Sequence, residues 1–458
     1  MFYTLVRRLA QIALRWYYRD IEIVGADRVP ADIPLLIVAN HPNAVIDPML
    51  VATTLSRRVT FTGKATLFEN PLSRVFLGAL GMVPLRRASD ERTRRQAGGA
   101  PDPQRNENAF RAVIEALGRR RAVLIFPEGK SHDEPSIAPL KTGAARMALQ
   151  ARAAGVRDLS ILPVGFVFED KSTPRTRVLV EVGEPLSIDG WSGGDGSAAV
   201  DRLTAEIDRR LRAVTMNYPT AAVGAEVARV SAVLAAEGVG ALGSGTSWAD
   251  IVAVGRRVDA AWRVFERASA AGGEPAHRAD LLRERLQELD GVAACARLDL
   301  RDAAIDVTAR SGAVFVARET AIMVIAAPFA LLGRLIHWPA LTVALMAARH
   351  TRTSDADPAM QTMVVGAPMV LLTWTLITAF AWALGGGFAA LATLLSLPLL
   401  ADCDFALRDR TARARARVRA YLRFRREPGL QQALVGGITA ARSDAAELER
   451  LLLAGGTA

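Results

Sequence analysis

The residues most suited to chemistry are His41 and Asp47, which lie in the polar segment 40–48 directly after the apolar run Leu35–Ala39. Reactive groups in α/β proteins are commonly placed where a strand ends. On one helix, two residues at this spacing would point about 120° apart, so His41 must lie on a turn to meet Asp47. Asp47 followed by Pro48 resembles a helix start, with Asp47 as the N-cap and Pro48 in the first helical position. We therefore expect a loop that folds His41 back toward the carboxylate.

A histidine paired with an aspartate is suited to the acylation of an alcohol. An alcohol that attacks a thioester needs a base near neutral pH, which imidazole supplies, and the carboxylate fixes its tautomer and stabilises the imidazolium. Two other interpretations stay open from the residues alone. Asp47 can be only a helix cap, and His41 can be a structural histidine.

Two further segments carry groups that suit a phosphorylated ligand. Gly81 permits a close backbone approach, and Arg87 offers a planar fork to phosphate oxygens. After the apolar run Val123–Phe126, Glu128 is placed to position an acceptor. Gly129, Lys130 and Ser131, with exposed backbone donors, are placed to hold phosphate. Each segment by itself is also compatible with an ordinary charged surface turn.

These residues need a scaffold, and residues 31–215 have the pattern of one α/β domain. Short apolar runs alternate with helical stretches, which is typical of strands and helices in turn. A Gly/Ser/Asp stretch at 190–197 interrupts the pattern, and Asp201–Val214 reads as a closing helix. The expected strands are Leu35–Ala39, Val59–Thr62, Val123–Phe126, Ile161–Phe168 and Arg177–Val182.

The segments on either side of this domain read as helical. Residues 1–30 begin with an amphipathic helix whose arginines interrupt any signal-peptide core, so we expect it to lie on a membrane surface. The alternative is a helix packed on its own domain. Residues 216–312 are rich in Ala, Arg and Glu with helical periodicity, and we interpret them as a connector.

Residues 313–402 contain two apolar blocks that we interpret as membrane-embedded hairpins. The block 320–348 is interrupted by Gly333, Arg334, His337 and Pro339 into runs shorter than the ~20 residues that cross a bilayer. The block 361–401 is nearly uncharged and is split at Gly385–Gly387 into one helix of spanning length and a shorter arm. Core helices of a soluble domain remain the alternative for the second block.

Residues 403–458 form an Arg-rich segment, which we expect on the cytoplasmic side of a membrane. The chain of 458 residues has a formal net charge of +10 and 51% apolar residues, so an anionic partner is expected and an anionic membrane lipid suits the composition. If the α/β domain is also cytosolic, the number of crossings must be even. We therefore expect the cytoplasmic membrane, with the catalytic domain on the cytosolic face.

Other classes of function fit the sequence less well. Cys295 and Cys403 show no metal-ligand or disulfide spacing, so no metal site is expected. The segment 238–243 matches a dinucleotide fingerprint but follows a helical run in place of a strand. Nucleic-acid binding would leave the apolar blocks unexplained. A thioesterase or a non-catalytic membrane scaffold remains a competing interpretation.

Together, four ordered segments resemble the glycerolipid acyltransferase superfamily over roughly residues 20–190. They are His41–Asp47, Gly81–Arg87, Phe126–Ser131 and Ile161–Val164. The resemblance implies an α/β acyltransferase domain followed by a helical region and C-terminal membrane-associated helices. It implies His41 as general base and Asp47 as its orienter, with Arg87, Glu128, Gly129, Lys130 and Ser131 at the acceptor site. It also implies acyl-CoA or acyl-carrier protein as co-substrate, with no other cofactor, and glycerol-3-phosphate, 1-acylglycerol-3-phosphate or another lysophospholipid as acceptor.

Two departures from the family pattern bear on the acceptor. Five residues separate His41 from Asp47, where the usual family spacing is four, and this variant resembles the branch with fungal glycerol-3-phosphate/dihydroxyacetone phosphate acyltransferases. That resemblance favours an unacylated acceptor. The usual Glu-Gly-Thr/Ser-Arg is here Glu128-Gly129-Lys130-Ser131, so Lys130 stands in for the expected arginine.

Overall fold

The computed structural model describes residues 2–85, 103–192, 196–234, 247–269, 274–350 and 358–455. The chain divides into two compact units. Unit 1 comprises Met1–Asn217 and Ala347–Val364, and unit 2 comprises Tyr218–Met346 and Val365–Ala458. Arg87 and the glycine-rich segment 238–243 lie outside the described residues.

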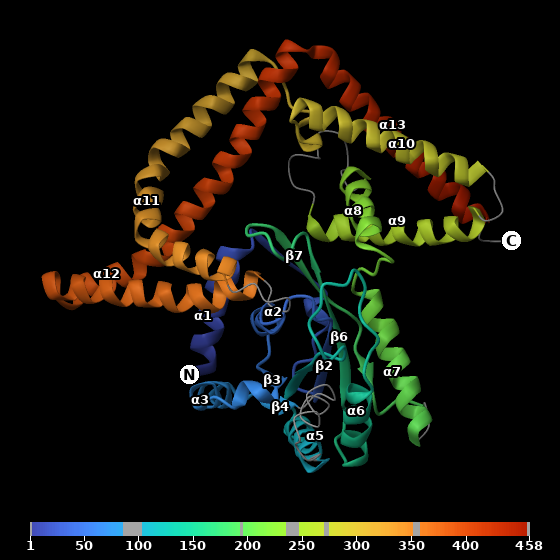
Figure 1. The fold of residues 1–458 in the computed structure, drawn as a ribbon, viewed down its shortest axis with the longest axis vertical. Coiled ribbons are helices and arrows are strands. Elements are labelled where there is room, and N and C mark those ends of the chain that lie inside the picture. Colours follow the sequence, from blue (N-terminus) through green and yellow to red (C-terminus); the bar gives the residue numbers. More distant parts are fainter. Residues whose placement is uncertain are drawn as a thin grey trace. The chain divides into compact units, whose positions relative to one another are not determined.

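The described strands of unit 1 form one mixed sheet in the order β1-β7-β6-β2-β5-β3-β4, with the short β8 added to β6 (Figure 1). At its centre β6, β2, β5 and β3 are parallel neighbours, whereas β7 runs antiparallel to β6. In the central register Val38 lies opposite Ile125 on one side and Pro163 on the other. The strands are β1 (Asp20–Val24), β2 (Leu35–Ala39), β3 (Val59–Lys64), β4 (Val83–Leu85), β5 (Ala122–Ile125), β6 (Ser160–Phe168), β7 (Arg177–Val182) and β8 (Leu186–Ser187).

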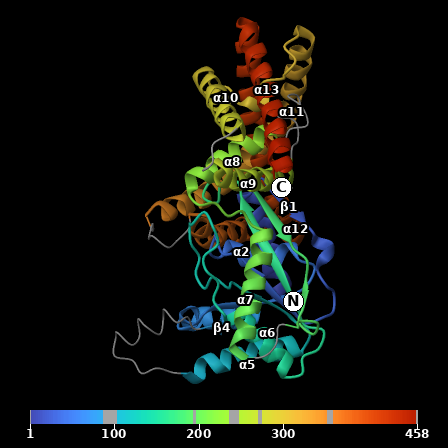
Figure 2. The same ribbon diagram turned by 90° about the vertical axis from the view of Figure 1, so that its right-hand side faces the viewer.

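Helices cover both faces of this sheet, which explains why its central strands are continuous apolar runs. Successive residues of β2 point to opposite faces: Leu35 and Ile37 belong to one core, and Leu36 and Val38 to the other. The first core is closed by α1 (Phe2–Tyr17) and α2 (Ile46–Thr54). The second is closed by α5 (Pro103–Gly118), α6 (Gly143–Ala153) and α7 (Gly196–Ala213), which lie along one face of the sheet in Figures 1 and 2.

The five strands expected from the sequence are confirmed as β2, β3, β5, β6 and β7, with ends that differ by at most two residues. Strands β1, β4 and β8 were not expected. They lie at or near the margins of the sheet, where burial is incomplete, and β4 and β8 are only 3 and 2 residues long. The expected closing helix corresponds to α7, which begins earlier, at Gly196.

Helix α1 packs on its own domain. Leu14 and Tyr17 are buried in the first core, and the Arg7 side chain donates a hydrogen bond of 2.7 Å to the carbonyl of Leu55 after α2. The packed-helix alternative is therefore the observed arrangement of the helix. Phe2 and Leu5 remain exposed.

Unit 2 consists, over its described residues, of long helices. They are α8 (Ala221–Leu234), α9 (Trp248–Ser269), α10 (Glu274–Ala296), α11 (Ala309–His350), α12 (Pro358–Arg426) and α13 (Pro428–Gly455), with a short 3-10 turn at Leu300–Asp302. The expectation of a hairpin within 320–348 is wrong. Helix α11 continues through Gly333 and Pro339, because a proline removes only one helical hydrogen bond and can bend a helix without ending it. Figure 1 shows this bend.

Helix α12 is interrupted where the sequence predicted. Gly386 has φ 71° and ψ −164°, a conformation that only glycine adopts readily, so two helices meet there. Helices α11 and α12 contain stretches long and apolar enough to cross a membrane, Ala309–Met346 and Thr362–Arg426. By length and composition alone this is weak evidence of membrane association.

Several arginines of α12 form ion pairs within unit 2. Arg410 donates to Glu319 of α11 at 2.6 Å, and Arg408 pairs with Asp404 at 2.6 Å. On the next turns, Phe424 is buried in a core with Leu434 and Ile438 of α13. The Arg-rich segment is therefore part of a packed helical core and also carries charge.

Gly165, in the middle of β6, offers a test of this packing. A Cβ atom there would lie 1.9 Å from the carbonyl oxygen of Val214, which is backbone and cannot rotate away. We expect Gly165→Ala to destabilise the protein by about 1–3 kcal/mol and lower the melting temperature of detergent-solubilised protein by several degrees.

Gly78, in the exposed helix α3 (Pro71–Leu80), is the matched control because a Cβ there meets nothing within 4 Å. Gly78→Ala should hold or slightly raise the melting temperature, since alanine is the better helix former. Equal melting temperatures for the two variants would contradict the close contact between β6 and the end of α7.

Candidate active site

The site lies at the edge of the sheet where β2 and β5 end. These parallel neighbours carry their following segments to the same edge, with His41 two residues after β2 and Glu128 three residues after β5. Such an edge is where open α/β sheets usually bind ligands. The sheet thus brings together two segments that are 87 residues apart in the sequence.

His41 and Asp47 form the expected pair. Nδ1 of His41 lies 2.9 Å from Oδ2 of Asp47, and the Asp47 side chain is fully buried. The same oxygen accepts a hydrogen bond of 2.8 Å from the backbone N–H of Asn43. The carboxylate therefore holds the imidazole and the intervening loop together.

The expectation that Asp47 caps α2 is wrong. The helix begins at Ile46, and its N-cap residue is Val45, which makes no side-chain capping bond. Asp47 lies in the first turn, where its oxygen reaches backward to His41 and Asn43 because the loop has turned toward it. Ala44 makes that turn with a φ of 38°, a strained value for a residue with a Cβ.

Neighbouring strands anchor the loop that carries His41. The Asn40 side chain donates to the Phe166 carbonyl at 3.1 Å and accepts from the Phe166 N–H at 2.8 Å, which ties the loop to β6. From the segment after β6, Lys171 Nζ donates to the Pro42 carbonyl at 2.6 Å. Lys171 also forms an ion pair with Asp133.

Hydrogen bonds around Asp170 hold the turn that presents Lys171. Burial alone would raise the pKa of the Asp170 carboxyl group. Hydrogen bonds from the Thr173 hydroxyl and from the backbone N–H groups of Ser172 and Thr173 outweigh burial and keep that pKa below its ordinary value. Asp170 therefore stays ionised near neutral pH, and the turn stays closed.

A stacking contact also holds the imidazole ring of His41. Its ring stacks on the ring of Phe126, with centroids 3.8 Å apart and an angle of 9° between the planes. Its side chain is 11% exposed. Within the part of the chain that the structure describes, no hydrogen bond to Nε2 is found, so this ring nitrogen is the one left to take a proton from a substrate.

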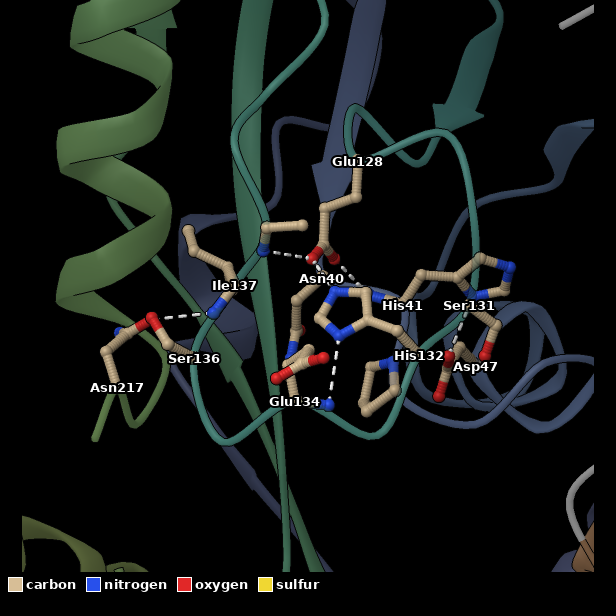
Figure 3. A network of polar contacts seen from close by, with 12 residues as sticks. Asn40, His41, Asp47, Glu128, Ser131, His132, Glu134, Ser136, Ile137 and Asn217 are labelled. Carbon is tan, nitrogen blue, oxygen red and sulfur yellow. Dashed lines mark hydrogen bonds and ion pairs between the residues drawn. The ribbon is translucent and has the colours of Figure 1, made fainter. Parts of the chain in front are cut away.

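Glu128 is buried and uses both carboxylate oxygens within the protein. Oε1 accepts from the backbone N–H of His41 at 2.7 Å. Oε2 accepts from the backbone N–H of Ala138 at 2.7 Å and contacts Nε2 of His132. Figure 3 shows the carboxylate directed at the backbone of His41 and at the ring of His132.

Sequence reasoning missed His132. The only local signal was a histidine four residues after Glu128 in a turn with other polar residues, a pattern that also occurs in ordinary exposed loops. Its backbone N–H donates to the His41 carbonyl at 3.4 Å, and its Nδ1 accepts from the Glu134 N–H at 3.2 Å. Farther along the segment, Ile137 N–H donates to the Asn217 side chain at 3.1 Å (Figure 3).

The remaining predicted residues of this segment lie around the same edge. Ser131 Oγ accepts from the Ala44 N–H at 3.0 Å, so it braces the loop between His41 and Asp47. Gly129 has a φ of 77°, and Lys130 is exposed. Gly81 also has a positive φ, because it ends α3 as a left-handed cap.

Comparisons with known proteins find matches to part of the chain. The Acyltransferase family model matches residues 20–167. Glycerol-3-phosphate O-acyltransferase 2 of Saccharomyces cerevisiae is 37% identical over 119 residues, which cover 25% of this chain and 16% of that protein. Glycerol-3-phosphate O-acyltransferase 1 of the same yeast is 36% identical over 85 residues, covering 17% of this chain and 10% of that protein.

An uncharacterized acyltransferase of Schizosaccharomyces pombe is 25% identical over 257 residues, covering 39% of this chain and 38% of that protein. The chain thus matches well under half the length of these relatives. Among solved structures, the 1-acyl-sn-glycerophosphate (LPA) acyltransferase PlsC of Thermotoga maritima is 19% identical with a TM-score of 0.35, covering 46% of this chain and 78% of that one. The part of the chain that holds His41, Asp47 and Glu128, residues 20–167, is therefore the part that matches the Acyltransferase domain.

Proposed function

We propose that unit 1 transfers a fatty acyl group from acyl-CoA or acyl-carrier protein to a hydroxyl of glycerol-3-phosphate or 1-acylglycerol-3-phosphate. The observation that carries the proposal is the state of the His41 ring. Its Nδ1 is held by a buried carboxylate, while its Nε2 has no partner among the described residues. This is the arrangement of a general base.

The reaction follows from that arrangement. The acceptor hydroxyl donates its proton to Nε2 of His41 as its oxygen bonds to the thioester carbonyl carbon. The Asp47 carboxylate stabilises the imidazolium that forms. The tetrahedral intermediate collapses, the carbon–sulfur bond breaks, and the thiolate takes the proton back from His41. The products are an ester and a free thiol, and the pair returns to its starting state.

Glycerol-3-phosphate is the acceptor we favour. Two of the matched relatives bear the name of glycerol-3-phosphate O-acyltransferases, and the spacing between His41 and Asp47 resembles that branch. Lys130 is exposed beside the site, and we propose that it binds the acceptor phosphate together with Arg87. Gly129, with its left-handed backbone, and Ser131 shape the same turn.

We further propose that α11 and α12 hold the protein in the cytoplasmic membrane and that the catalytic domain and the Arg-rich segment share the cytosolic face. The apolar stretches of both helices support attachment. The dense arginines that follow the apolar part of α12 favour the cytosolic side and contact with anionic lipid.

Replacing the base should nearly abolish the reaction. His41→Ala should lower turnover of labelled acyl-CoA with glycerol-3-phosphate by ~10²- to 10⁴-fold, with an unchanged melting temperature. Asp47→Asn should be severely impaired as well, because an amide does not stabilise imidazolium. Since Asp47 is not the cap of α2, loss of a cap does not account for such a result.

The control is His277→Ala, because His277 is an exposed histidine on α10 of the other unit. It should match wild type. Turnover above about a tenth of wild type in both the His41 and Asp47 variants would reject the base mechanism and leave a non-catalytic scaffold as the better explanation.

Lys130→Ala should weaken acceptor use and spare donor use. Loss of a charged contact to phosphate should raise the KM for glycerol-3-phosphate about tenfold and leave the KM for acyl-CoA near wild type. Arg119→Ala is the control, because Arg119 is an exposed cation that precedes β5 at the other end of that strand. An acceptor KM equal in both variants would remove Lys130 from the phosphate site.

Membrane topology can be measured with tags at the N-terminus and after Arg426. Both tags should be reached by protease only when the inner face of membrane vesicles is exposed, because an even number of crossings separates them. Tags reporting opposite faces would contradict the proposed arrangement of α11 and α12.

A further inference from the structure

The backbone of His41 is held at both of its polar groups by one segment, residues 128–132. Its N–H donates to Oε1 of Glu128 at 2.7 Å, and its carbonyl accepts from the N–H of His132 at 3.4 Å. These two bonds fix the peptide planes on either side of His41. They therefore help to set the direction in which its side chain leaves the loop.

The hydrogen bonds of the His132 ring define its protonation. The Glu134 N–H donates to Nδ1 at 3.2 Å, so Nδ1 must carry a lone pair. The proton of the neutral ring is then on Nε2, which donates it to Oε2 of Glu128. One ring nitrogen of His132 accepts a hydrogen bond and the other donates one. The ring is therefore neutral, and neither nitrogen is left for acid–base chemistry.

The orientation of the Glu128 carboxylate depends on the hydrogen bond from the His132 ring. The Glu128 side chain is 1% exposed, so its charge needs hydrogen-bond donors around it. Of the three donors found among the described residues, two are backbone N–H groups, from His41 and Ala138, and one is the ring of His132. Removing the ring leaves an underpaired buried carboxylate, which will turn toward another donor or toward water and release the His41 N–H.

We propose that His132 is a positioning residue of the acyl transfer reaction. As a neutral imidazole it orients Glu128, and Glu128 in turn fixes the backbone of His41 so that Nε2 points at the acceptor hydroxyl. The inference rests on the proposed role of His41 as base. It assigns Glu128 to holding the loop, where the resemblance alone would assign it to the acceptor.

The test compares His132→Ala with His132→Gln in the full-length protein, using labelled acyl-CoA and glycerol-3-phosphate. A misplacement of a catalytic group by about 1 Å can cost ~10²-fold in rate, so His132→Ala should lower kcat by ~10- to 100-fold. The KM values of both substrates should stay within about twofold, because both ring nitrogens of His132 are used within the protein. Glutamine places an amide N–H about where Nε2 lies, so His132→Gln should recover at least a third of the wild-type kcat.

His277→Ala, with the same change at an exposed histidine of the other unit, should leave kcat unchanged. A wild-type kcat in His132→Ala overturns the proposal, and so does a rise in the KM for glycerol-3-phosphate with kcat retained, which would make His132 an acceptor contact. The proposal is also overturned if both variants lose kcat equally and both have a lower melting temperature. His132 would then only stabilise the fold.

His41→Ala, measured in parallel, separates this inference from the proposed function. An inactive His41 variant beside a fully active His132→Ala rejects only the role of His132. An active His41 variant rejects the general base itself, and the role of His132 with it.

Discussion

Strands β2 and β5 run side by side in the same direction, with Val38 opposite Ile125, so the segments that leave them start at the same edge of the sheet. Every contact between the His41 loop and the segment 128–132 follows from that parallel pairing. The two strands are buried on both faces, and a slip of register by one residue would move apolar side chains of β2 into the wrong core. The hydrophobic pattern of two short strands thus fixes the meeting of two polar segments that are distant in sequence.

Two buried carboxylates, those of Asp47 and Glu128, hold His41 at different atoms. Asp47 approaches from α2 and takes the ring nitrogen Nδ1, while Glu128 approaches from the end of β5 and takes the backbone N–H. A buried carboxylate is costly unless donors surround it, so each one also gathers backbone N–H groups, from Asn43 for Asp47 and from Ala138 for Glu128. The same requirement that stabilises the charges makes the loop rigid. The position of His41 is therefore a consequence of charge satisfaction as much as of chain connectivity.

The sequence predicted the parts of this arrangement that depend on local pattern. Continuous apolar runs identified the central strands, and the types and spacing of His41 and Asp47 predicted their pairing across a turn. The helix cap was predicted wrongly, because Asp-Pro is a common helix start and only the loop conformation at Ala44 shows that the carboxylate turns backward. The role of His132 could not be predicted, since its contact with Glu128 depends on how the whole turn folds against β2. Hydrogen bonds between distant segments leave no periodicity in the sequence.

Contacts between helices α11 and α12 were also not predictable from the sequence. The glycine and proline residues within 320–348 look like the turn of a hairpin. In the structure, a Cβ at Gly333 would lie 2.1 Å from the carbonyl oxygen of Leu400. Glycine at this position therefore lets the backbones of α11 and α12 pack against each other. Close approach through small residues is how helices associate where burial of apolar surface gives little driving force, as in a bilayer. Trp374 donates to His337 at 2.9 Å, and Glu319 binds Arg410, so polar groups on the two helices also satisfy one another. A glycine that ends a helix and a glycine that lets two helices pack closely look the same in the sequence. They can be distinguished only when the neighbouring helix is known.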